Sequence, residues 1–185
     1  MAFDIAAFKA QLTLDGARPS LFQVTINNPV DNNAFLKIPF MVKAAGLPET
    51  ATNPIVVGYM GRDIKVPGKR TFQPWNVTII NDEDFLVRNG FEAWGQALNL
   101  NQSNVRNLAS SSPLLYKSTA QVTQFSKTGV PLRTYEMQGL WPSLIGNIEL
   151  NWDNGDQIEE FQVQLEYDYW TIVQPTITGF AGGDF

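Results

Sequence analysis

Carboxylate side chains are the first candidates for chemistry in this sequence, because paired carboxylates can act as general acid and base or bind calcium. Glu159 and Glu160 are adjacent. Neighbouring residues of a strand point to opposite faces, so this pair cannot flank one glycosidic bond. Asp153 and Asp156 stand beside an Asn-Gly pair, without the Asp-x-Asp-x-Asp-Gly spacing of an EF-hand calcium loop. We interpret them as turn residues.

Other kinds of catalytic or binding residue are also missing. The chain contains no histidine and no cysteine, which removes the commonest general base, the commonest metal ligand and the nucleophilic arrangements built on them. Residues 46–70 combine glycines with lysines, but the Gly-x-x-x-x-Gly-Lys-Ser/Thr pattern of a phosphate-binding loop is not present. We therefore expect no enzymatic activity, no cofactor and no bound metal.

Composition indicates a folded domain. The chain has 185 residues, which suits one domain with a substantial core, and 44% hydrophobic and 12% aromatic residues argue against disorder. No run approaches the ~20 apolar residues that span a bilayer. No secretion signal is visible at the N-terminus. We expect no membrane anchor.

The net charge of −5 is unevenly distributed along the chain. All 13 basic residues lie at or before Arg133, whereas the last 52 residues contain nine acidic residues and no basic one, so the two parts carry +4 and −9. Two interpretations remain open: ordinary solvated surface charge, or a polar molecule whose complementary ends stack. In either case an acidic chain is a poor candidate for tight DNA binding.

Residues 139–170 contain the most regular pattern of the chain. Apolar and polar residues alternate over residues 148–152 and 161–169, which predicts two strands, each with one apolar and one polar face. Asn154-Gly155 between them suits a tight type I′ turn, so we predict an antiparallel hairpin. Its polar face carries amides and carboxylates, namely Glu149, Asn151, Gln162, Gln164, Glu166 and Asp168.

Weaker patterns indicate the remaining elements. Strands are predicted around residues 22–26, 72–80, 116–125 and 134–138, and extended structure over 35–42. Val87, Phe91, Trp94 and Leu98 recur at helical spacing and predict one principal helix over residues 82–99. Residues 46–70 contain several prolines and glycines and are predicted to be a long irregular loop with two short strand candidates, a kind of segment that is usually functional.

Taken together, these segments resemble the tail tube proteins of contractile-tail bacteriophages. The resemblance is carried by Gly-Leu-Trp-Pro at 139–142, Gly-x-Ile-x-Leu-x-Trp-Asp at 146–153 and Phe-x-Val-x-Leu-x-Tyr-Asp-Tyr-Trp at 161–170. Residues 17–24, 43–48, 57–62, 70–78 and 81–83 resemble earlier segments of the family. No single motif is decisive, but the ordered set across residues 16–170 is specific.

The resemblance implies a fold and an assembly. The fold would be a mainly β, antiparallel β-sandwich or half-barrel with one principal helix. It would be one domain over residues 1–185, with a family core at 16–170 and a C-terminal extension at 171–185. Six-membered rings would stack into the inner tube of a contractile tail, each subunit giving strands to a barrel around a lumen. Inner tubes of type VI secretion and of phage-like bacteriocins would show a similar sequence pattern.

The resemblance also implies partners and a location. The subunit would be a structural virion protein, assembled in the cytoplasm of the bacterial host. Its partners would be further copies of itself, the tail sheath, the baseplate, the tail terminator and the tape-measure protein. DNA would pass through the lumen without specific binding.

Two sets of site residues follow from this interpretation. A conduit must let DNA slide, so a neutral to acidic lining suits it, and we predict that Glu149, Asn151, Gln162, Gln164, Glu166 and Asp168 line the lumen, with Thr134 and Glu136 nearby. Alternation does not determine which face points inward, so these residues could also face outward. Contacts between subunits or rings are predicted for residues 46–70, through Ile55, Tyr59, Arg62, Lys65, Lys69 and Arg70. The alternative function is a β-sandwich carbohydrate-binding module whose site is formed by exposed aromatics and the Asn-rich loop at 99–113.

Overall fold

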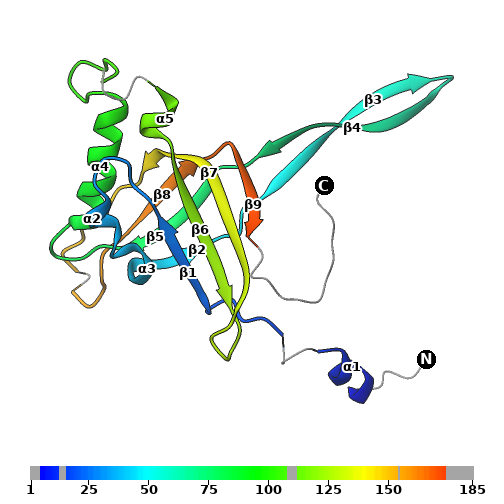
Figure 1. The fold of residues 1–185 in the computed structure, drawn as a ribbon, viewed down its shortest axis with the longest axis horizontal. Helices are drawn as coiled ribbons and strands as arrows, with labels where there is room; N and C mark the ends of the chain where they lie inside the picture. Colours follow the sequence, from blue (N-terminus) through cyan, green and yellow to red (C-terminus); the bar gives the residue numbers. More distant parts are fainter. Residues whose placement is uncertain (1–4, 13–15, 108–111, 154, 174–185) are drawn as a thin grey trace.

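The computed structural model describes residues 5–12, 16–107, 112–153 and 155–173. Its body is an antiparallel sheet that folds over on itself, with one principal helix at one end and a long two-stranded ribbon projecting from the other (Figure 1). In chain order the elements are α1 (Ile5–Gln11), β1 (Phe22–Ile26), α2 (Asn32–Phe35), α3 (Ile38–Met41), β2 (Val42–Ala45), β3 (Thr50–Tyr59), β4 (Arg62–Phe72), β5 (Trp75–Ile80), α4 (Leu86–Leu98), α5 (Pro113–Tyr116), β6 (Ser118–Phe125), β7 (Pro131–Ile145), β8 (Glu160–Glu166) and β9 (Tyr169–Val173).

The sheet has two halves that share strand β7. Sheet A consists of β1, β6, the first part of β7, and β9, in that order. Sheet B consists of the last part of β7, then β8, β5 and β2. All pairings are antiparallel. The predicted mainly β, antiparallel architecture with one principal helix is therefore confirmed.

The change of partner along β7 occurs at a bend around Gly139. Gly139 has φ +73, a conformation that residues with a Cβ rarely adopt. A Cβ at this position would lie 2.6 Å from the Asp168 carboxyl carbon. Asp168 separates β8 from β9, donates its N–H to the Gln138 carbonyl oxygen over 2.9 Å, and accepts from Lys117 Nζ over 2.6 Å. Glycine thus lets the carboxylate close against the backbone where the two sheet halves meet.

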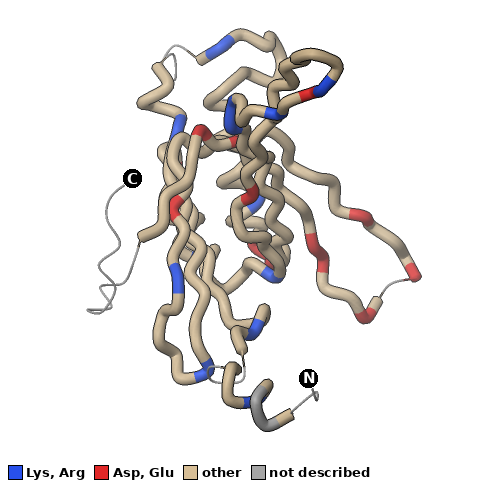
Figure 2. Tube along the Cα trace, turned by 90° about the vertical axis from the view of Figure 1, so that its right-hand side faces the viewer, with Lys and Arg blue, Asp and Glu red and all other residues tan. Residues whose placement is uncertain are grey.

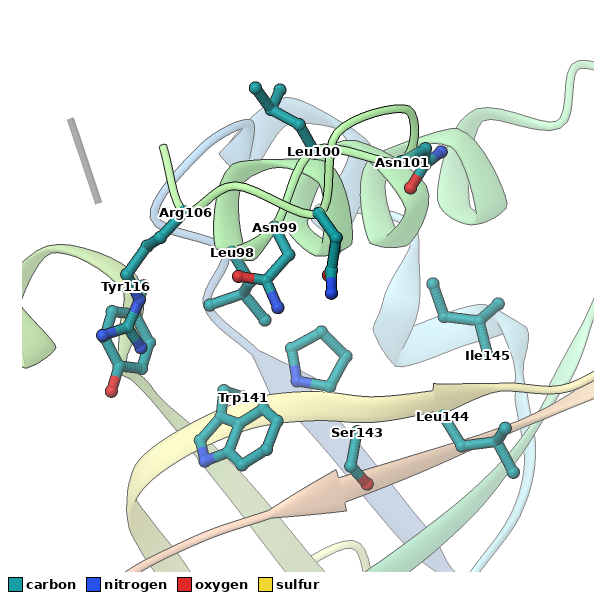
Figure 3. A pocket seen from close by; sticks show the side chains of 13 residues that line it. Leu98, Asn99, Leu100, Asn101, Arg106, Tyr116, Trp141, Ser143, Leu144 and Ile145 are labelled. Atoms are coloured by element: carbon teal, nitrogen blue, oxygen red, sulfur yellow. The ribbon is translucent and has the colours of Figure 1, made fainter. Parts of the chain in front are cut away.

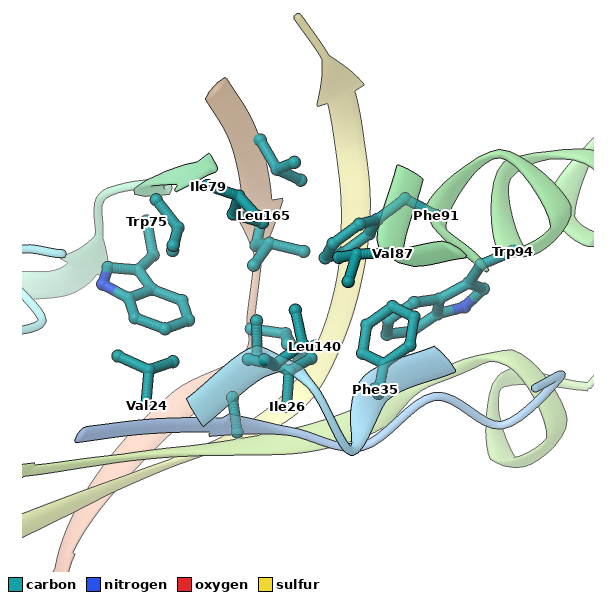
Figure 4. Close-up of a cluster of buried hydrophobic side chains, with 14 of the residues drawn as sticks. Val24, Ile26, Phe35, Trp75, Ile79, Val87, Phe91, Trp94, Leu140 and Leu165 are labelled. Atoms are coloured by element: carbon teal, nitrogen blue, oxygen red, sulfur yellow. The ribbon is translucent and has the colours of Figure 1, made fainter. Parts of the chain in front are cut away.

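One apolar core lies between the sheet halves and extends under α4 (Figure 4). Alternating residues of the strands enter it from both sides, and Val87, Phe91 and Trp94 of α4 cover its end. Phe35 packs edge-on against Phe91 with ring centroids 4.7 Å apart. Gly90 permits this approach, because a Cβ there would lie 2.8 Å from the Phe35 ring. The helical apolar stripe is confirmed as core.

The principal helix begins later than the sequence predicts. Residues 82–85 form a turn in which the Phe85 N–H donates to the Asp82 carbonyl oxygen, and Phe85 has φ 51. Asp84 then accepts from the Leu86 N–H and pairs with Lys37. The hydrogen bond from Lys37, with the Leu86 N–H as a second donor, holds the pKa of Asp84 below its ordinary value. The acidic residues thus tie the turn before α4 to the α2–α3 segment.

Two local predictions are wrong. Residues 148–152 form no strand, and β8 pairs with β5 and β7 instead of closing a hairpin across Asn154-Gly155, of which Asn154 lies outside the described residues. Of the alternating apolar residues before the turn, only Ile148 packs against the core, whereas Trp152 is 100% exposed. Residues 35–42 are mostly helical, in α2 and α3, because Asp31 caps α2 by accepting from the Asn33 N–H and Phe35 turns into the core.

Replacing Gly139 should test how far the bend controls stability. Gly139→Ala combines a strained positive φ with the approach to Asp168, and we expect it to lower the free energy of unfolding by about 2–3 kcal/mol. Gly129→Ala is the matched control, because Gly129 has φ +79 but no atom within 4 Å of the place a Cβ would take, so only the backbone cost of about 1 kcal/mol applies. Urea denaturation of both variants measures the difference, and equal losses would contradict the role given to Asp168.

Candidate functional site

The ribbon formed by β3 and β4 is the most prominent surface feature of the molecule. It is a continuous antiparallel hairpin from the Thr50–Phe72 pair to the Tyr59–Arg62 pair, and it projects well away from the body (Figure 1). Met60 and Gly61, both with positive φ, form its tight turn. The prediction of an irregular loop over residues 46–70 is therefore wrong, although its two short strand candidates lie within β3 and β4.

One face of the ribbon is apolar and exposed. Directly opposed residues share a face, and alternate residues return to it. The apolar face carries Ile55, Val57, Tyr59, Ile64 and Val66, of which Ile55 is 56% and Tyr59 63% exposed. An isolated two-stranded ribbon is only marginally stable in water. This face is therefore a candidate contact surface.

The four basic residues predicted for contacts are spread along the ribbon. Arg62 opposes Tyr59 on the apolar face, whereas Lys65 opposes Val56 on the other face. Arg70 opposes Thr52 near the root, and Lys69 lies next to it in β4. Pro54 opposes Pro67 where the register shifts. The predicted contact residues thus belong to one projecting element but do not form a single face.

The root of the ribbon is firmly attached to the body. Tyr167 donates its hydroxyl to the Glu49 carbonyl oxygen over 3.2 Å, and its ring lies 5.9 Å from that of Phe72. Trp75 Nε1 donates to the Gly46 carbonyl oxygen over 2.7 Å. Burial, with smaller contributions from the carboxylates of Glu49 and Glu166, raises the pKa of Tyr167, so the phenol stays a neutral donor. The ribbon leaves the body in a defined direction.

The residues predicted to line a lumen are divided by the structure. Gln162, Gln164 and Glu166 share the outward face of β8 in sheet B, beside Asn76 and Thr78 of β5. Asp168 lies at the junction and pairs with Lys117. Glu149 and Asn151 lie off the sheet, in the segment between β7 and β8. Only three of the six residues therefore share one surface.

Sheet A carries a second polar face, of which the sequence indicated only Thr134 and Glu136 as neighbours of the lumen lining. The outward side chains of β1, β6 and β7 in sheet A are mostly threonine and glutamine, because Thr25 opposes Gln121, Gln121 opposes Glu136 and Thr123 opposes Thr134. On the same face, β9 adds Tyr169, Thr171 and Val173. The Thr123 and Thr134 hydroxyls are hydrogen-bonded at 3.0 Å. Glu136 is the single charged side chain on this face among the described residues of the four strands. The alternation of polar and apolar residues over 118–125 predicts one polar face for this strand. The sequence does not show that the strand pairs with β1.

The segment between β7 and β8, described over residues 146–153 and 155–159, is an exposed acidic projection. It protrudes from the body with carboxylates along it (Figure 2). Leu150 is 79% exposed and Ile158 71%, and these side chains with Trp152 border an open hollow of about 960 Å³. Glu159 accepts from Asn81 Nδ2 over 2.9 Å, and Glu160 pairs with Lys43, so the end of the segment is held against sheet B.

A further hollow lies beside the C-terminal end of α4 (Figure 3). It has a volume of about 620 Å³ and combines asparagines of the loop after α4 with Tyr116 and Trp141. Arg106 already stacks on the Tyr116 ring at 5.2 Å. Part of the Asn-rich loop, residues 108–111, lies outside the described residues. Across the part of the chain that the structure describes, no three His, Cys, Asp or Glu side chains gather to hold a metal ion.

Comparisons with known proteins identify the family. The family model described as phage tail tube protein matches residues 5–173. The tail tube protein of Enterobacteria phage T4 is 38% identical over 157 residues, which cover 84% of this chain and 91% of that protein. The chain belongs to the phage tail tube protein family. It is a structural protein of the contractile phage tail and a component of the virion.

Solved structures share the tail tube fold. A chain of the anti-feeding prophage tube-terminating cap superposes with a TM-score of 0.59 at 17% identity, covering 85% of this chain and 91% of that chain. A chain of the sheath–tube complex of an extracellular contractile injection system gives a TM-score of 0.53 at 14% identity, covering 93% and 99%. The tail tube interpretation is confirmed in preference to a carbohydrate-binding module. None of the helices described for this tail tube protein has the length and apolar character needed to cross a membrane.

The apolar face of the ribbon can be tested without disturbing the core. Val57→Ser with Ile64→Ser replaces one opposed pair of exposed side chains, so we expect the free energy of unfolding of the monomer to change by less than about 0.5 kcal/mol. Self-association, measured by sedimentation, should fall strongly. Val56→Ser is the control, because Val56 is similarly exposed on the opposite face. Equal association of both variants would show that the apolar face is not an interface.

Proposed function

We propose that six copies of this tail tube protein form a ring by joining their sheets edge to edge, and that rings stack into a hollow tube. The observation that carries the proposal is that no strand among the described residues pairs with the outer sides of β1 and β9 in sheet A. Strands β1 and β9 are its outer strands, and each has 5 residues. Unpaired edge strands are templates for pairing with another chain. Joining β1 of one copy to β9 of the next would continue the sheet around a closed barrel.

Sheet B is less suited to this role. One of its edges is the last part of β7, and the end of α4 with the loop after it lies over that strand across the hollow shown in Figure 3. A covered edge is protected from strand addition. Sheet A therefore supports continuous pairing around a ring better than sheet B does.

Ring closure through sheet A would turn its Thr- and Gln-rich face toward the lumen. Hydroxyl and amide groups do not attract phosphates as Lys and Arg do, so DNA could slide past them. Glu136 would add one negative charge per subunit. The competing arrangement is the lining predicted from the sequence, in which Gln162, Gln164 and Glu166 of sheet B face the lumen. The two faces lie on opposite sides of the folded sheet, so only one can line it.

Single cysteines distinguish these arrangements, because the natural chain has none. Gln121→Cys places a thiol on the exposed face of sheet A, and Gln162→Cys places one on that of sheet B. A maleimide attached to a protein too bulky to enter the tube should label Gln162→Cys in assembled tubes and leave Gln121→Cys unlabelled. Both variants should react fully after disassembly, which is the control. The reverse pattern would support the sheet B lining.

The remaining roles complete the proposal. The ribbon of β3 and β4 contacts a neighbouring subunit or the next ring, through Ile55, Tyr59, Arg62, Lys65, Lys69 and Arg70. The tube surrounds tape-measure protein and then DNA, and it contacts the sheath, the baseplate and a terminator. Neighbours in fold come from a sheath–tube complex and a tube-terminating cap, which supports these partners. The subunit acts as a structural element without catalysis.

Electron microscopy of the purified protein tests the assembly directly. We expect six-fold rings and stacks of rings with a central channel, and two-dimensional class averages give the symmetry. A protein that stays monomeric at high concentration, in the absence and in the presence of a baseplate to nucleate it, would contradict the proposal.

A further inference from the structure

We infer that the apolar face of the β3–β4 ribbon binds the acidic projection, residues 146–153 and 155–159, of another copy of the same chain. This inference rests on the proposed tube assembly and names the partner surface for the ribbon. It is carried by three observations: two exposed apolar surfaces on one molecule, opposite charges around them, and their positions at opposite ends of the fold.

The ribbon supplies the first surface. Beyond its root it is bordered by solvent on both faces, and its five apolar side chains form a continuous strip. Residues 50–72 contain four basic residues and one acidic residue, Asp63. No ion pair within the described chain involves Arg62, Lys65, Lys69 or Arg70. The ribbon is thus an apolar strip with unpaired positive charge around it.

The acidic projection supplies the second surface. Three of its four large apolar side chains, Leu150, Trp152 and Ile158, are exposed and border the hollow described above. The fourth, Ile148, packs against the core. Residues 146–159 contain four acidic residues and no basic residue. In the described structure, Glu149, Asp153 and Asp156 have no cationic partner. An exposed tryptophan beside apolar side chains, with charges at the rim, is typical of a protein interface.

The two surfaces are chemically complementary. Contact would cover the apolar strip of the ribbon with Leu150, Trp152 and Ile158, and burial of apolar area favours association. The basic residues of the ribbon would then lie among the carboxylates of the projection. These charge pairs would fix how the two surfaces align and would favour this partner over others. Two ribbons, or two projections, would repel each other.

Their positions make the contact intermolecular. The ribbon projects from one end of the long axis of the molecule, and the segment between β7 and β8 lies toward the other end (Figure 1). The ribbon therefore cannot reach the projection of its own copy. Two different surfaces on opposite sides of one subunit produce head-to-tail association, which generates rings or stacks and not isolated dimers.

Charge reversal tests the pairing. The ribbon variant Arg62→Glu with Lys65→Glu should repel the acidic projection of its neighbours, and the projection variant Asp153→Lys with Asp156→Lys should repel the basic ribbon. Each variant alone should raise the protein concentration needed for tube formation about tenfold or more at low salt. All four positions are exposed, so the thermal unfolding midpoint of the monomer should not move.

Mixing the two variants is the decisive measurement. In a one-to-one mixture every ribbon can meet a projection of opposite charge, so tubes should form near the wild-type concentration and contain both variants in equal amounts. A single chain with all four substitutions is the matched control, and it should also assemble. Light scattering follows assembly, and mass spectrometry of pelleted tubes gives the composition.

The outcomes separate this inference from the proposed function. If the wild-type protein forms no rings or tubes, the proposed function fails. If wild-type tubes form and either variant assembles alone as the wild type does, the ribbon does not bind the projection and only the inference fails. Failure of either the mixture or the four-substitution chain to assemble would also overturn it.

Discussion

The closure of Asp168 against Gly139 is the contact on which the arrangement of this tail tube protein depends. It lies where β7 stops pairing with β9 and begins to pair with β8, so it joins the two halves of the sheet. Lys117 binds the same carboxylate, which brings the start of β6 to the junction. Tyr167, the residue before Asp168, holds the root of the ribbon, and the residue after it begins β9. A few residues therefore set the relative positions of core, ribbon and open sheet edge.

The molecule separates its stable parts from its associating parts. The core between sheets A and B is fully buried and is closed at its end by the aromatic side chains of α4. The ribbon and most of the acidic projection contribute little to that core and present their side chains to solvent, whereas β1 buries Val24 and Ile26 and offers its edge and its polar face for association. Substitutions at these surfaces can alter association with small effects on folding, because the two sets of contacts share few residues.

Sequence patterns predicted the parts of the fold that bury one face of a regular element. Trp75, Val77 and Ile79 alternate into the core as expected, and Val87, Phe91 and Trp94 form the expected helical stripe. Alternation also separated Gln162 and Gln164 from the core side of β8. It could not show that β8 pairs with β5, because this partner is about eighty residues away in the chain and periodicity contains no information on pairing.

The failures have related physical causes. Residues 148–152 alternate, but only Ile148 packs against the core, and Leu150 and Trp152 are left in solvent. Residues 50–72 form long strands despite Pro54, Gly58 and Pro67, because the tight turn at Met60-Gly61 and the cross-strand pairing outweigh the local effect of these residues. Composition was therefore enough to predict that these residues form a contact region. The extended shape and the apolar face could not be predicted, because they depend on the register in which β3 pairs with β4.

The opposed prolines of the ribbon have a consequence for the pool of unassembled subunits. Proline has no backbone N–H, so Pro54 and Pro67 interrupt the row of donors along the outer edges of the ribbon. Such residues act as gatekeepers against fibril-like stacking of apolar strands. A host cell producing many copies before tail assembly starts would otherwise accumulate an exposed Val- and Ile-rich ribbon with two free edges. The prolines leave the side-chain face available to a specific neighbour while hindering indiscriminate strand addition.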